Sequence, residues 1–384
     1  MTAHFTIFGT NSSTFKTYLR FAFADEGMRE VAISFISQLW IAQNSRAEGV
    51  RIKSTRLRQE FGRNIGKIIA ELRASGYLNA TKYKVGCFSQ RYCLTPKMTR
   101  FKFEEIGEQK KLETLQKHES DRSILPPIYR KISENASKTI FDSEKAKAFV
   151  KAYPYCSQTA RDWRESFITL IERGDFPAPQ VDRYGRLHYF WTATPRDLRP
   201  FFKSPDGRVL AHIDVASAQV CLHASLYSPD SLEKLRFIEI CQQGTFWNLL
   251  NEQLPVQFDL KNEDSKRKLK EMVFQDTFYA WRTYSSPYTE AFKRLLPELA
   301  ALVIKERRNR IIGSADHIST EMQELESTII IKTAIASVLN ESPDAYICSL
   351  HDCVICTDDM KNQVKNAINA AFLGKLGFAP KLKE

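Results

Sequence analysis

The stretch Ala211-His-Ile-Asp-Val-Ala-Ser-Ala-Gln-Val-Cys-Leu-His-Ala-Ser-Leu226 decides the fold. Val209 and Ile213 place an apolar run just before Asp214, which predicts a buried strand, and the run from Gln219 to Leu226 is typical of a helix. Asp214 therefore comes where a strand leaves its sheet. There a carboxylate can face solvent and a metal ion.

About 140 residues later the chain repeats this arrangement. The apolar runs 345–350 and 353–357 flank His351-Asp352, which predicts a hairpin with Asp352 at or near its turn. Two aspartates on adjacent strand ends can hold two divalent ions about 4 Å apart, as in many in-line phosphoryl transfers. Each aspartate alone is more typical of a turn than of a metal site.

Length and composition bound the class of protein. A chain of 384 residues is expected to form two or three domains. It has no apolar run long enough to span a membrane, and its start lacks the features of a signal peptide. The eight cysteines follow no framework spacing, which favours reduced thiols and a cytoplasmic location without a membrane partner.

The net charge of +11 is concentrated in one region. Residues 51–103 contain thirteen Lys and Arg against Glu60 and Glu71, a difference of 13 − 2 = 11 that equals the excess of the whole chain. A localised cationic region attracts a polyanion, most commonly a phosphate backbone.

The same region predicts a winged helix-turn-helix. Helical patterns at 31–42, 54–61 and 65–72 are followed by strand patterns at 80–85 and 89–94 around Gly86. The residues expected to contact nucleic acid are Arg56, Arg58, Arg63 and Lys67 on the recognition side, with Lys82, Lys84 and Arg91 in the wing. The alternative is a structural helical domain with a solvated basic face.

The remaining boundaries follow from composition. Residues 1–27 form an unassigned arm, 28–100 the winged helix and 101–145 a polar linker with Pro126-Pro127. Residues 146–172 have the pattern of one helix. The rest, 146–384, is expected to be the catalytic core.

Two further segments carry candidate contacts. Gly185-Arg186 predicts a turn that presents a guanidinium to a phosphate. Residues 261–284 predict a helix with cations one turn before aromatic rings, which suits a nucleoside triphosphate; the residues are Lys266, Lys270, Phe274, Phe278 and Tyr279. The alternative is an ordinary amphipathic surface helix.

A long helix at 318–339 is expected to carry a polar face made by Glu321, Gln323, Glu324, Glu326 and Lys332. Cys353 and Cys356 have the spacing of zinc ligands. Within a strand, however, their side chains would point to opposite faces, which favours buried thiols, as for Cys348.

In this order, the blocks resemble the palm and fingers of the family A (DNA polymerase I-type) polymerases, which are related to single-subunit RNA polymerases. Gly185-Arg186 is similar to the Gly-Arg segment of that family, and Ser217 and Gln219 to the Ser-Gln that follows the first catalytic Asp. The steps from Lys266 to Phe278 are similar to its nucleotide-gripping helix. Residues 323–332 are similar to the helix after the fingers, and His351-Asp352 to its final motif. The resemblance covers roughly residues 180–372.

The resemblance implies an α+β right-hand polymerase core after the winged helix, with a thumb-like part at 146–180 and palm and fingers at 181–384. Asp214 and Asp352 would bind two Mg²⁺ ions, with Mn²⁺ as an alternative, and Lys270 would be the third catalytic residue. Gln219 and His351 would join the nucleotide-binding helix residues in contacting the nucleotide. The expected partners are DNA, as duplex or primer–template, and nucleoside triphosphates; no obligate protein partner is indicated.

The implied activity is a DNA polymerase without proofreading, with a role in replication initiation of a mobile element. Two positions depart from the family pattern. Cys221 stands where DNA-making members have a sugar-restricting Glu, and Cys353 follows His351-Asp352 in place of Glu or Ser. An RNA polymerase or primase with the same site is therefore the first alternative. A non-catalytic DNA-binding regulator with a decayed palm is the second.

Overall fold

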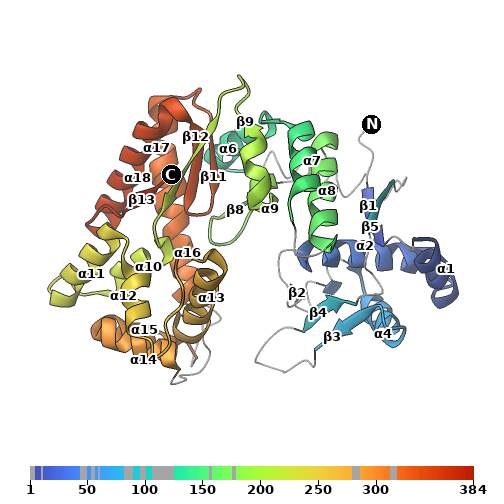
Figure 1. The fold of residues 1–384 in the computed structure, drawn as a ribbon, viewed down its shortest axis with the longest axis horizontal. Coiled ribbons are helices and arrows are strands. Elements are labelled where there is room, and N and C mark those ends of the chain that lie inside the picture. Colours follow the sequence, from blue (N-terminus) through green and yellow to red (C-terminus); the bar gives the residue numbers. More distant parts are fainter. Residues whose placement is uncertain are drawn as a thin grey trace. The chain divides into compact units, whose positions relative to one another are not determined.

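The structure is a computed structural model that describes residues 5–9, 12–43, 50–52, 57–58, 61–81, 90–95, 101–105, 125–154, 158–174, 179–278, 286–311 and 318–384. These residues form a mixed α and β chain in two compact units (Figure 1). Unit 1 comprises Met1–His118, Phe141–Phe176 and Pro195–Phe201, and unit 2 comprises Glu119–Ile140, Pro177–Thr194 and Phe202–Glu384. No helix within the described ranges has the length and apolar character that crossing a membrane requires.

Unit 1 combines helices with two small antiparallel sheets. Its elements are β1 (Phe5–Gly9), α1 (Ser12–Ala22), α2 (Glu26–Gln43), β2 (Val50–Arg51), α4 (Ile65–Ala74), β3 (Leu78–Ala80), β4 (Arg91–Leu94), β5 (Phe101–Glu105), α7 (Ser143–Ala152), α8 (Gln158–Arg173) and a 3-10 turn (Arg196–Phe201). One sheet pairs β1 with β5, and the other has the order β2-β4-β3.

The core of unit 1 follows from helical spacing. Ile65, Ile68, Ile69 and Leu72 recur at the three- and four-residue steps that place side chains on one face of α4, and all four are buried. They belong to one apolar cluster with side chains of α1, α2, α7 and α8.

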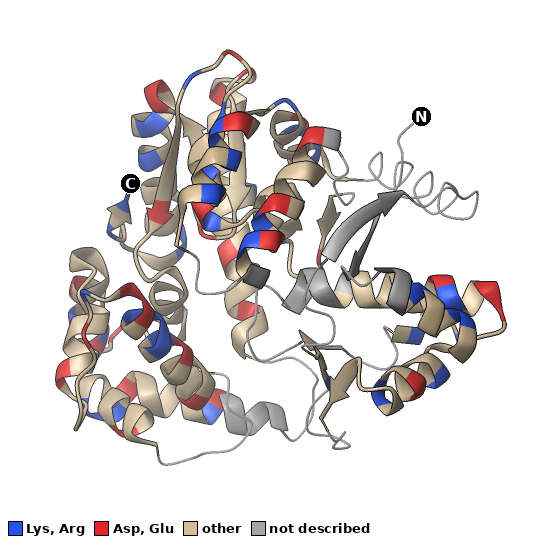
Figure 2. Ribbon diagram, turned by 45° about the vertical axis from the view of Figure 1, so that its right-hand side comes forward, with Lys and Arg blue, Asp and Glu red and all other residues tan. Residues whose placement is uncertain are grey.

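Acidic and basic residues are interspersed along many of the helices (Figure 2).

The expected helices at 31–42 and 65–72 are present as α2 and α4. β4 covers most of the expected strand at 89–94 and pairs with β3, with Leu78 opposite Leu94 and Ala80 opposite Tyr92. β3 overlaps the expected strand at 80–85 only at Ala80. Most of the expected helix at 54–61 and the connection at 82–89 lie outside the described residues. The winged-helix assignment stays a prediction.

Unit 2 is built around a four-stranded antiparallel sheet with the order β11-β12-β10-β13. The strands of this sheet are β10 (Leu210–Val215), β11 (Ile347–Leu350), β12 (Cys353–Thr357) and β13 (Leu382–Lys383). Unit 2 also contains the short strands β7 (Gln180–Val181), β8 (Leu187–His188) and β9 (Phe202–Lys203). The α-helices of unit 2 are α6 (Pro127–Ser137), α9 (Phe190–Ala193), α10 (Ala218–Leu222), α11 (Leu232–Gln243), α12 (Phe246–Glu252), α13 (Glu263–Val273), α14 (Pro287–Leu295), α15 (Pro297–Ile311), α16 (Ile318–Ser327), α17 (Ala336–Glu341) and α18 (Lys361–Leu376).

Two π-helical segments interrupt the long helices of unit 2. Phe274–Phe278 continues α13, and Thr328–Ile335 joins α16 to α17. Short 3-10 turns at His223–Leu226 and Asp358–Met360 complete the unit. A π turn contains more residues than an α turn, so the side chains beyond it are rotated relative to a regular four-residue repeat.

The sheet positions Asp214 through its alternation. In β10 the side chains of Ala211, Ile213 and Val215 are buried, whereas Asp214 lies on the opposite, partly exposed face. Ile213 is opposite Val354, which packs against Val364 and Ile368 of α18 and against the helix from 328 to 341. The face that carries Asp214 is therefore the one turned away from α18.

β11 and β12 are buried along their whole length because helices cover them. On α6, Asn135 donates from its side-chain amide to the carbonyl oxygens of Ala345 and Ile347 at 3.1 and 3.0 Å. The helices α11 to α15 gather at one end of the sheet (Figure 1). This end is the one at which β10 leaves the sheet toward α10.

The expected division of the chain differs from the observed one. Residues 127–137, expected within a linker, form α6 and pack on β11 of unit 2. The segment 146–172, expected as a single thumb-like helix of the catalytic core, forms α7 and α8, whose apolar side chains join the core of unit 1. Pro154 follows the end of α7, where its ring cannot continue a helix. The expected arm at 1–27 contains α1, whose Phe15 and Leu19 are buried in the same core.

Candidate active site

Two aspartates meet at one end of the unit 2 sheet. β11 and β12 form the expected hairpin, in which Leu350 pairs with Cys353 and His351-Asp352 is the two-residue turn. Asp214 lies opposite Cys353 in the adjacent strand, and the Val215 amide donates to the Asp352 carbonyl oxygen at 3.4 Å. The prediction that Asp214 lies at a strand end and Asp352 at a hairpin turn is confirmed.

The electrostatics of Asp352 follow from this crowding. Its burial, and then the carboxylates of Glu326 and Asp214, raise the pKa of Asp352 to about 7, while the Arg186 guanidinium acts in the opposite direction. Carboxylates that raise one another's pKa repel, and a cation between them relieves the repulsion.

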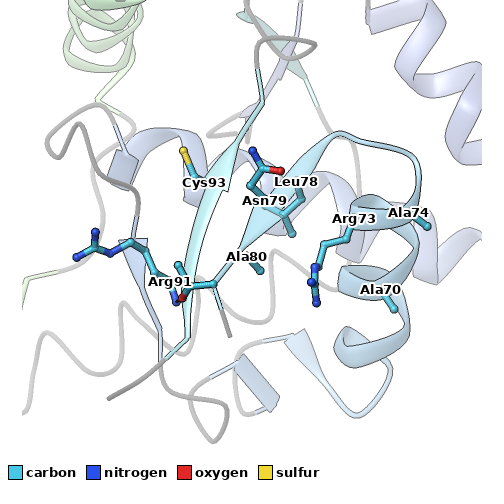
Figure 3. Close-up of a pocket in the computed structure, with 9 residues that line it drawn as sticks. Ala70, Arg73, Ala74, Leu78, Asn79, Ala80, Arg91 and Cys93 are labelled. Carbon is cyan, nitrogen blue, oxygen red and sulfur yellow. Dashed lines mark hydrogen bonds between the residues drawn. The ribbon is translucent and has the colours of Figure 1, made fainter. Parts of the chain in front are cut away.

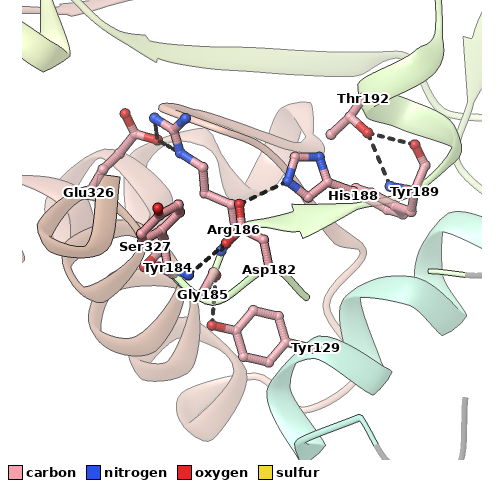
Figure 4. A network of polar contacts seen from close by, with 10 residues as sticks. All are labelled: Tyr129, Asp182, Tyr184, Gly185, Arg186, His188, Tyr189, Thr192, Glu326 and Ser327. Carbon is pink, nitrogen blue, oxygen red and sulfur yellow. Dashed lines mark hydrogen bonds and ion pairs between the residues drawn. The ribbon is translucent and has the colours of Figure 1, made fainter. Parts of the chain in front are cut away.

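A third carboxylate, Glu326 of α16, is buried beside this pair, with 3% of its side chain exposed. Nε and Nη2 of Arg186 both contact its Oε1, at 2.9 and 2.7 Å (Figure 4). Burial raises the pKa of Glu326, and the pairing with Arg186 and a hydrogen bond from Gln219 oppose that change. Arg186 was expected to present its guanidinium to a phosphate; in the structure that group is bound to Glu326 because an unpaired carboxylate in the interior is costly.

The turn that carries Arg186 is fixed by Asp182. Oδ1 of Asp182 accepts hydrogen bonds from the backbone amides of Tyr184 and Arg186, both at 2.9 Å, and Oδ2 contacts the His188 ring at 3.0 Å (Figure 4). These hydrogen bonds contribute to a lowered pKa of the Asp182 carboxyl, although burial acts against them. A side-chain carboxylate that accepts from amides two and four residues ahead holds a tight turn.

Gly185 is required at this turn by its conformation and its surroundings. Its φ is +77°, and a β-carbon would lie 2.8 Å from Oγ of Ser327. Its carbonyl oxygen accepts from the Tyr129 hydroxyl at 2.8 Å, and the Ser327 hydroxyl donates to the Tyr184 carbonyl at 2.5 Å. The turn is thereby attached to α6 and α16 and sets the position of Arg186.

Lys270 of α13 lies within interaction range of Asp214. Its ammonium lies 5.5 Å from the centre of the Trp247 ring. Burial, followed by the charges of Lys383 and Lys266, lowers the pKa of Lys270, whereas Asp214 acts to raise it. Lys270 is thus brought together with Asp214, while Lys266, one turn earlier, pairs with Glu263 at 3.3 Å.

The aromatic residues of the same segment differ in exposure. Phe274 is partly exposed and lies 5.8 Å from the Trp247 ring. Phe278 is fully buried against His223 and Phe292, with ring centres 4.5 and 5.2 Å apart. The π segment rotates Phe278 into the interior, so its ring packs inside the helical region and is not available to a ligand. Tyr279, expected beside it, lies outside the described residues.

Gln219 and His351 both lie near the carboxylates. The Gln219 side chain hydrogen bonds to Glu326, and the backbone carbonyl oxygen of Gln219 is 2.7 Å from Nδ1 of His223. His351 adopts φ of +58° in the hairpin turn, and its ring centre is 6.0 Å from that of His188. Gln219 is therefore connected to Glu326, and His351 contacts His188 of the Asp182 turn.

Apart from Arg186, the candidate nucleic-acid contacts belong to unit 1. Arg58, Arg63 and Lys67 are exposed on and before α4. Arg91 lines an open cavity of about 700 Å³ between α4 and the strands β3 and β4, with Arg73 on its other side (Figure 3). Arg56, Lys82 and Lys84 lie outside the described residues.

The donor set fits one kind of metal. Within the described ranges, no group of three or more His, Cys, Asp or Glu side chains forms a metal site by itself. Mg²⁺ is often held by only one or two carboxylates together with substrate phosphates and water, which suits the pair Asp214 and Asp352. Cys348, Cys353 and Cys356 are buried thiols, as expected.

Two participants in this site were not predicted. Glu326 was assigned to the polar face of a helix, because its partner Arg186 is 140 residues away in the sequence. The role of Asp182 was not predicted, although an Asp shortly before a Gly is typical of a side-chain-stabilised turn.

Comparison with known proteins gives a limited result. No protein-family model and no curated protein matches the chain. Among solved structures, it is similar to the POL domain of Pol1 from M. smegmatis in complex with DNA primer-template and dNTP, with 12% sequence identity and a TM-score of 0.39. The match covers 63% of this chain and 55% of that one, so the chain spans about half the length of that structure. A likeness of this size carries no functional weight.

Proposed function

We propose that unit 2 is a template-directed nucleotidyltransferase that extends a nucleic acid strand, acting as a DNA polymerase without proofreading. The observation that carries this proposal is the meeting of Asp214 and Asp352 at adjacent strand ends, with Lys270 close enough to Asp214 for their charges to interact. Carboxylates beside a lysine are suited to a metal-bound polyphosphate, because the carboxylates can bind the metal ion and the ammonium can bind the phosphates.

Asp214 and Asp352 would hold Mg²⁺, in two ions by analogy with other phosphoryl transfer sites. When bound, the metal would stabilise negative charge on the reacting phosphate and lower the pKa of the attacking hydroxyl. Asp352, whose pKa is raised to about 7, is expected to be fully charged only when a cation is present.

The protein's own groups would then act by position and charge. Lys270 would neutralise charge on the departing pyrophosphate, and its partial burial strengthens that interaction. Phe274, partly exposed one turn later, would contact the base or sugar. Arg186 and Glu326 would not contact substrate. Their ion pair would stabilise the buried side of the site and fix the position of Gln219.

Unit 1 would bind the DNA. Arg58, Arg63 and Lys67 present exposed cations around α4, and the helices α2 and α4 precede a strand pair, as in a winged helix. The contacts expected from such a surface are with phosphates, which position the nucleic acid and carry little sequence information.

Ribonucleotides are the second candidate substrate, which would make the protein an RNA polymerase or primase. Cys221, at the position where the resemblance implies a sugar-restricting Glu, is fully buried, and its thiol donates to the Ala216 carbonyl at 3.5 Å. It therefore presents no group to exclude a 2′-hydroxyl.

The test is extension of a labelled primer on a DNA template. Wild-type protein is incubated with four dNTPs or four NTPs, each with Mg²⁺ or with a chelator. We expect extension with dNTPs that requires the metal; extension with NTPs alone would favour the second candidate. No extension with either pool, while the protein still binds DNA, would contradict both and favour a non-catalytic regulator.

A further inference from the structure

The strand β13 brings a lysine to the aspartate pair. In its pairing with β10, Lys383 is directly opposite Asp214 and Leu382 is opposite Val215. Directly opposed residues of an antiparallel pair point to the same face of the sheet, with β-carbons about 5 Å apart. Lys383 therefore lies on the face that carries Asp214, and its side chain is exposed.

Contacts on both sides of Lys383 hold it in place. The Lys381 carbonyl accepts from the Ala216 amide at 2.8 Å, and the Lys381 amide donates to the Cys241 carbonyl at 3.3 Å. On the other side, the Glu384 carboxylate pairs with Lys361 of α18 at 3.2 Å and also with Lys365. The backbone at Lys383 is therefore held between two fixed neighbours.

Lys383 is close enough to Lys270 for the two charges to interact. Its positive charge, with that of Lys266, acts together with burial to lower the pKa of Lys270. Lys270 is thus within interaction range of Lys383, Lys266 and Asp214. Like charges held near one another repel, and this arrangement is favourable once a polyanion lies among them.

We propose that Lys383 is a further cation of a polyphosphate-binding site, contacting the same phosphate chain as Lys270. This inference rests on the proposed function, because it assigns the residue to the triphosphate of the nucleotide. Lys383 acts in binding. Its ammonium neutralises ground-state charge on the phosphates that are released as pyrophosphate.

The test is calorimetric titration of the full chain with inorganic tripolyphosphate at low ionic strength. Lys383→Ala is compared with wild type, with the charge-preserving Lys383→Arg and with Lys375→Ala, a matched control at an exposed position of α18. We expect the dissociation constant to rise about tenfold for Lys383→Ala, as for the loss of a charge-assisted hydrogen bond. Lys383→Arg and Lys375→Ala should stay within about twofold of wild type.

Equal affinity of Lys383→Ala and wild type overturns the proposal, as does a wild-type protein that does not bind tripolyphosphate. Thermal unfolding of each variant establishes that β13 remains in place. Primer extension by wild type separates the two hypotheses. If wild type binds tripolyphosphate through Lys383 but does not extend a primer, the proposed function is refuted and the polyphosphate site stands. If wild type extends a primer but Lys383→Ala binds tripolyphosphate as tightly as wild type, only the polyphosphate role of Lys383 is refuted.

Discussion

Units 1 and 2 handle charge in opposite ways. In the described part of unit 1, the polar side chains that are buried are Ser37 and Ser166, and the bases Arg58, Arg63 and Lys67 are exposed. In unit 2 the interior includes the carboxylate of Glu326 and the ring of His223. Polar groups buried in a core lower stability unless they are paired, so Glu326 depends on its ion pair with Arg186, whereas an exposed base is stabilised by water.

The largest expected effect is on the reaction itself. Asp214→Asn and Asp352→Asn should each lower the rate of nucleotide incorporation by about a thousandfold or more, because each removes a ligand that stabilises transition-state charge. Single-turnover incorporation measures this loss. Asp344→Asn, an exposed position just before β11, is the matched control and should keep the wild-type rate. A rate within tenfold of wild type for either aspartate variant would contradict the site.

The second effect compares a buried ion pair with a partly exposed one. Arg186→Leu leaves Glu326 unpaired in the interior of unit 2 and should lower the free energy of unfolding by about 3–5 kcal/mol. In unit 1, Arg164 pairs with Asp197 at 3.0 Å with about a fifth of each side chain exposed. Arg164→Leu should cost about 1 kcal/mol or less.

Urea unfolding of the two arginine variants gives the comparison directly. Equal losses would mean that burial does not distinguish the two pairs. Glu326→Gln, which removes the buried charge together with its pairing, should restore part of the stability when it is combined with Arg186→Leu.

The third effect is a pH dependence in unit 2. Burial lowers the pKa of His223 from 6.5 to about 4, so the folded protein keeps this ring neutral. The unfolded chain binds the proton more readily, so the contribution of His223 to stability is lost as the pH falls from about 6.5 toward 4, by about 3 kcal/mol. Asp352, whose pKa is raised to about 7, contributes with the opposite sign over this range, so the effect of His223 is the difference between the slopes of wild type and His223→Leu, measured by urea unfolding at several pH values. An unchanged slope would show that His223 is not the group responsible.

The fourth effect separates two lysines on one helix. Lys270→Ala should lower the single-turnover rate constant about tenfold, because Lys270 interacts with Asp214 and would meet charge that develops on the phosphate. Lys268→Ala, exposed on the same helix, should stay near wild type. Similar rates for both variants would remove Lys270 from the site.

The smallest effect concerns the exposed charges of unit 1. Replacing Arg58, Arg63 and Lys67 together with Ala should reduce the slope of log affinity against log salt by about 0.9 for each phosphate that is no longer neutralised. Titration of duplex DNA at several salt concentrations measures the slope. Lys151→Ala, exposed on α7, serves as the control. An unchanged slope for the triple variant would mean that these bases are only a solvated surface.

The parts of unit 2 that the sequence predicts are those whose pattern is local. The apolar run before Asp214 and the two runs around His351-Asp352 are short strands with a turn between them, and the structure has them at those positions. Lys270 could be associated with the aspartates because the motifs follow in a recognisable order.

The features that escaped prediction depend on distant partners. Burial of Glu326 follows from its pairing with Arg186, and Lys383 reaches Asp214 through a strand of only two residues. The four-residue repeat from Lys266 to Phe278 could not reveal the π segment that buries Phe278. The grouping of α7 and α8 with unit 1 is likewise decided by packing between segments far apart in the chain.

The central claim is that Asp214 and Asp352 form one divalent-cation site. Electron paramagnetic resonance of Mn²⁺ tests it directly, because the free ion gives a signal that disappears on binding. The titration contains protein and Mn²⁺ alone, because a nucleoside triphosphate would itself bind the ion. Wild type should bind Mn²⁺, and Asp214→Asn and Asp352→Asn should each weaken binding by at least about tenfold. Binding by both variants with the affinity of wild type would contradict the claim.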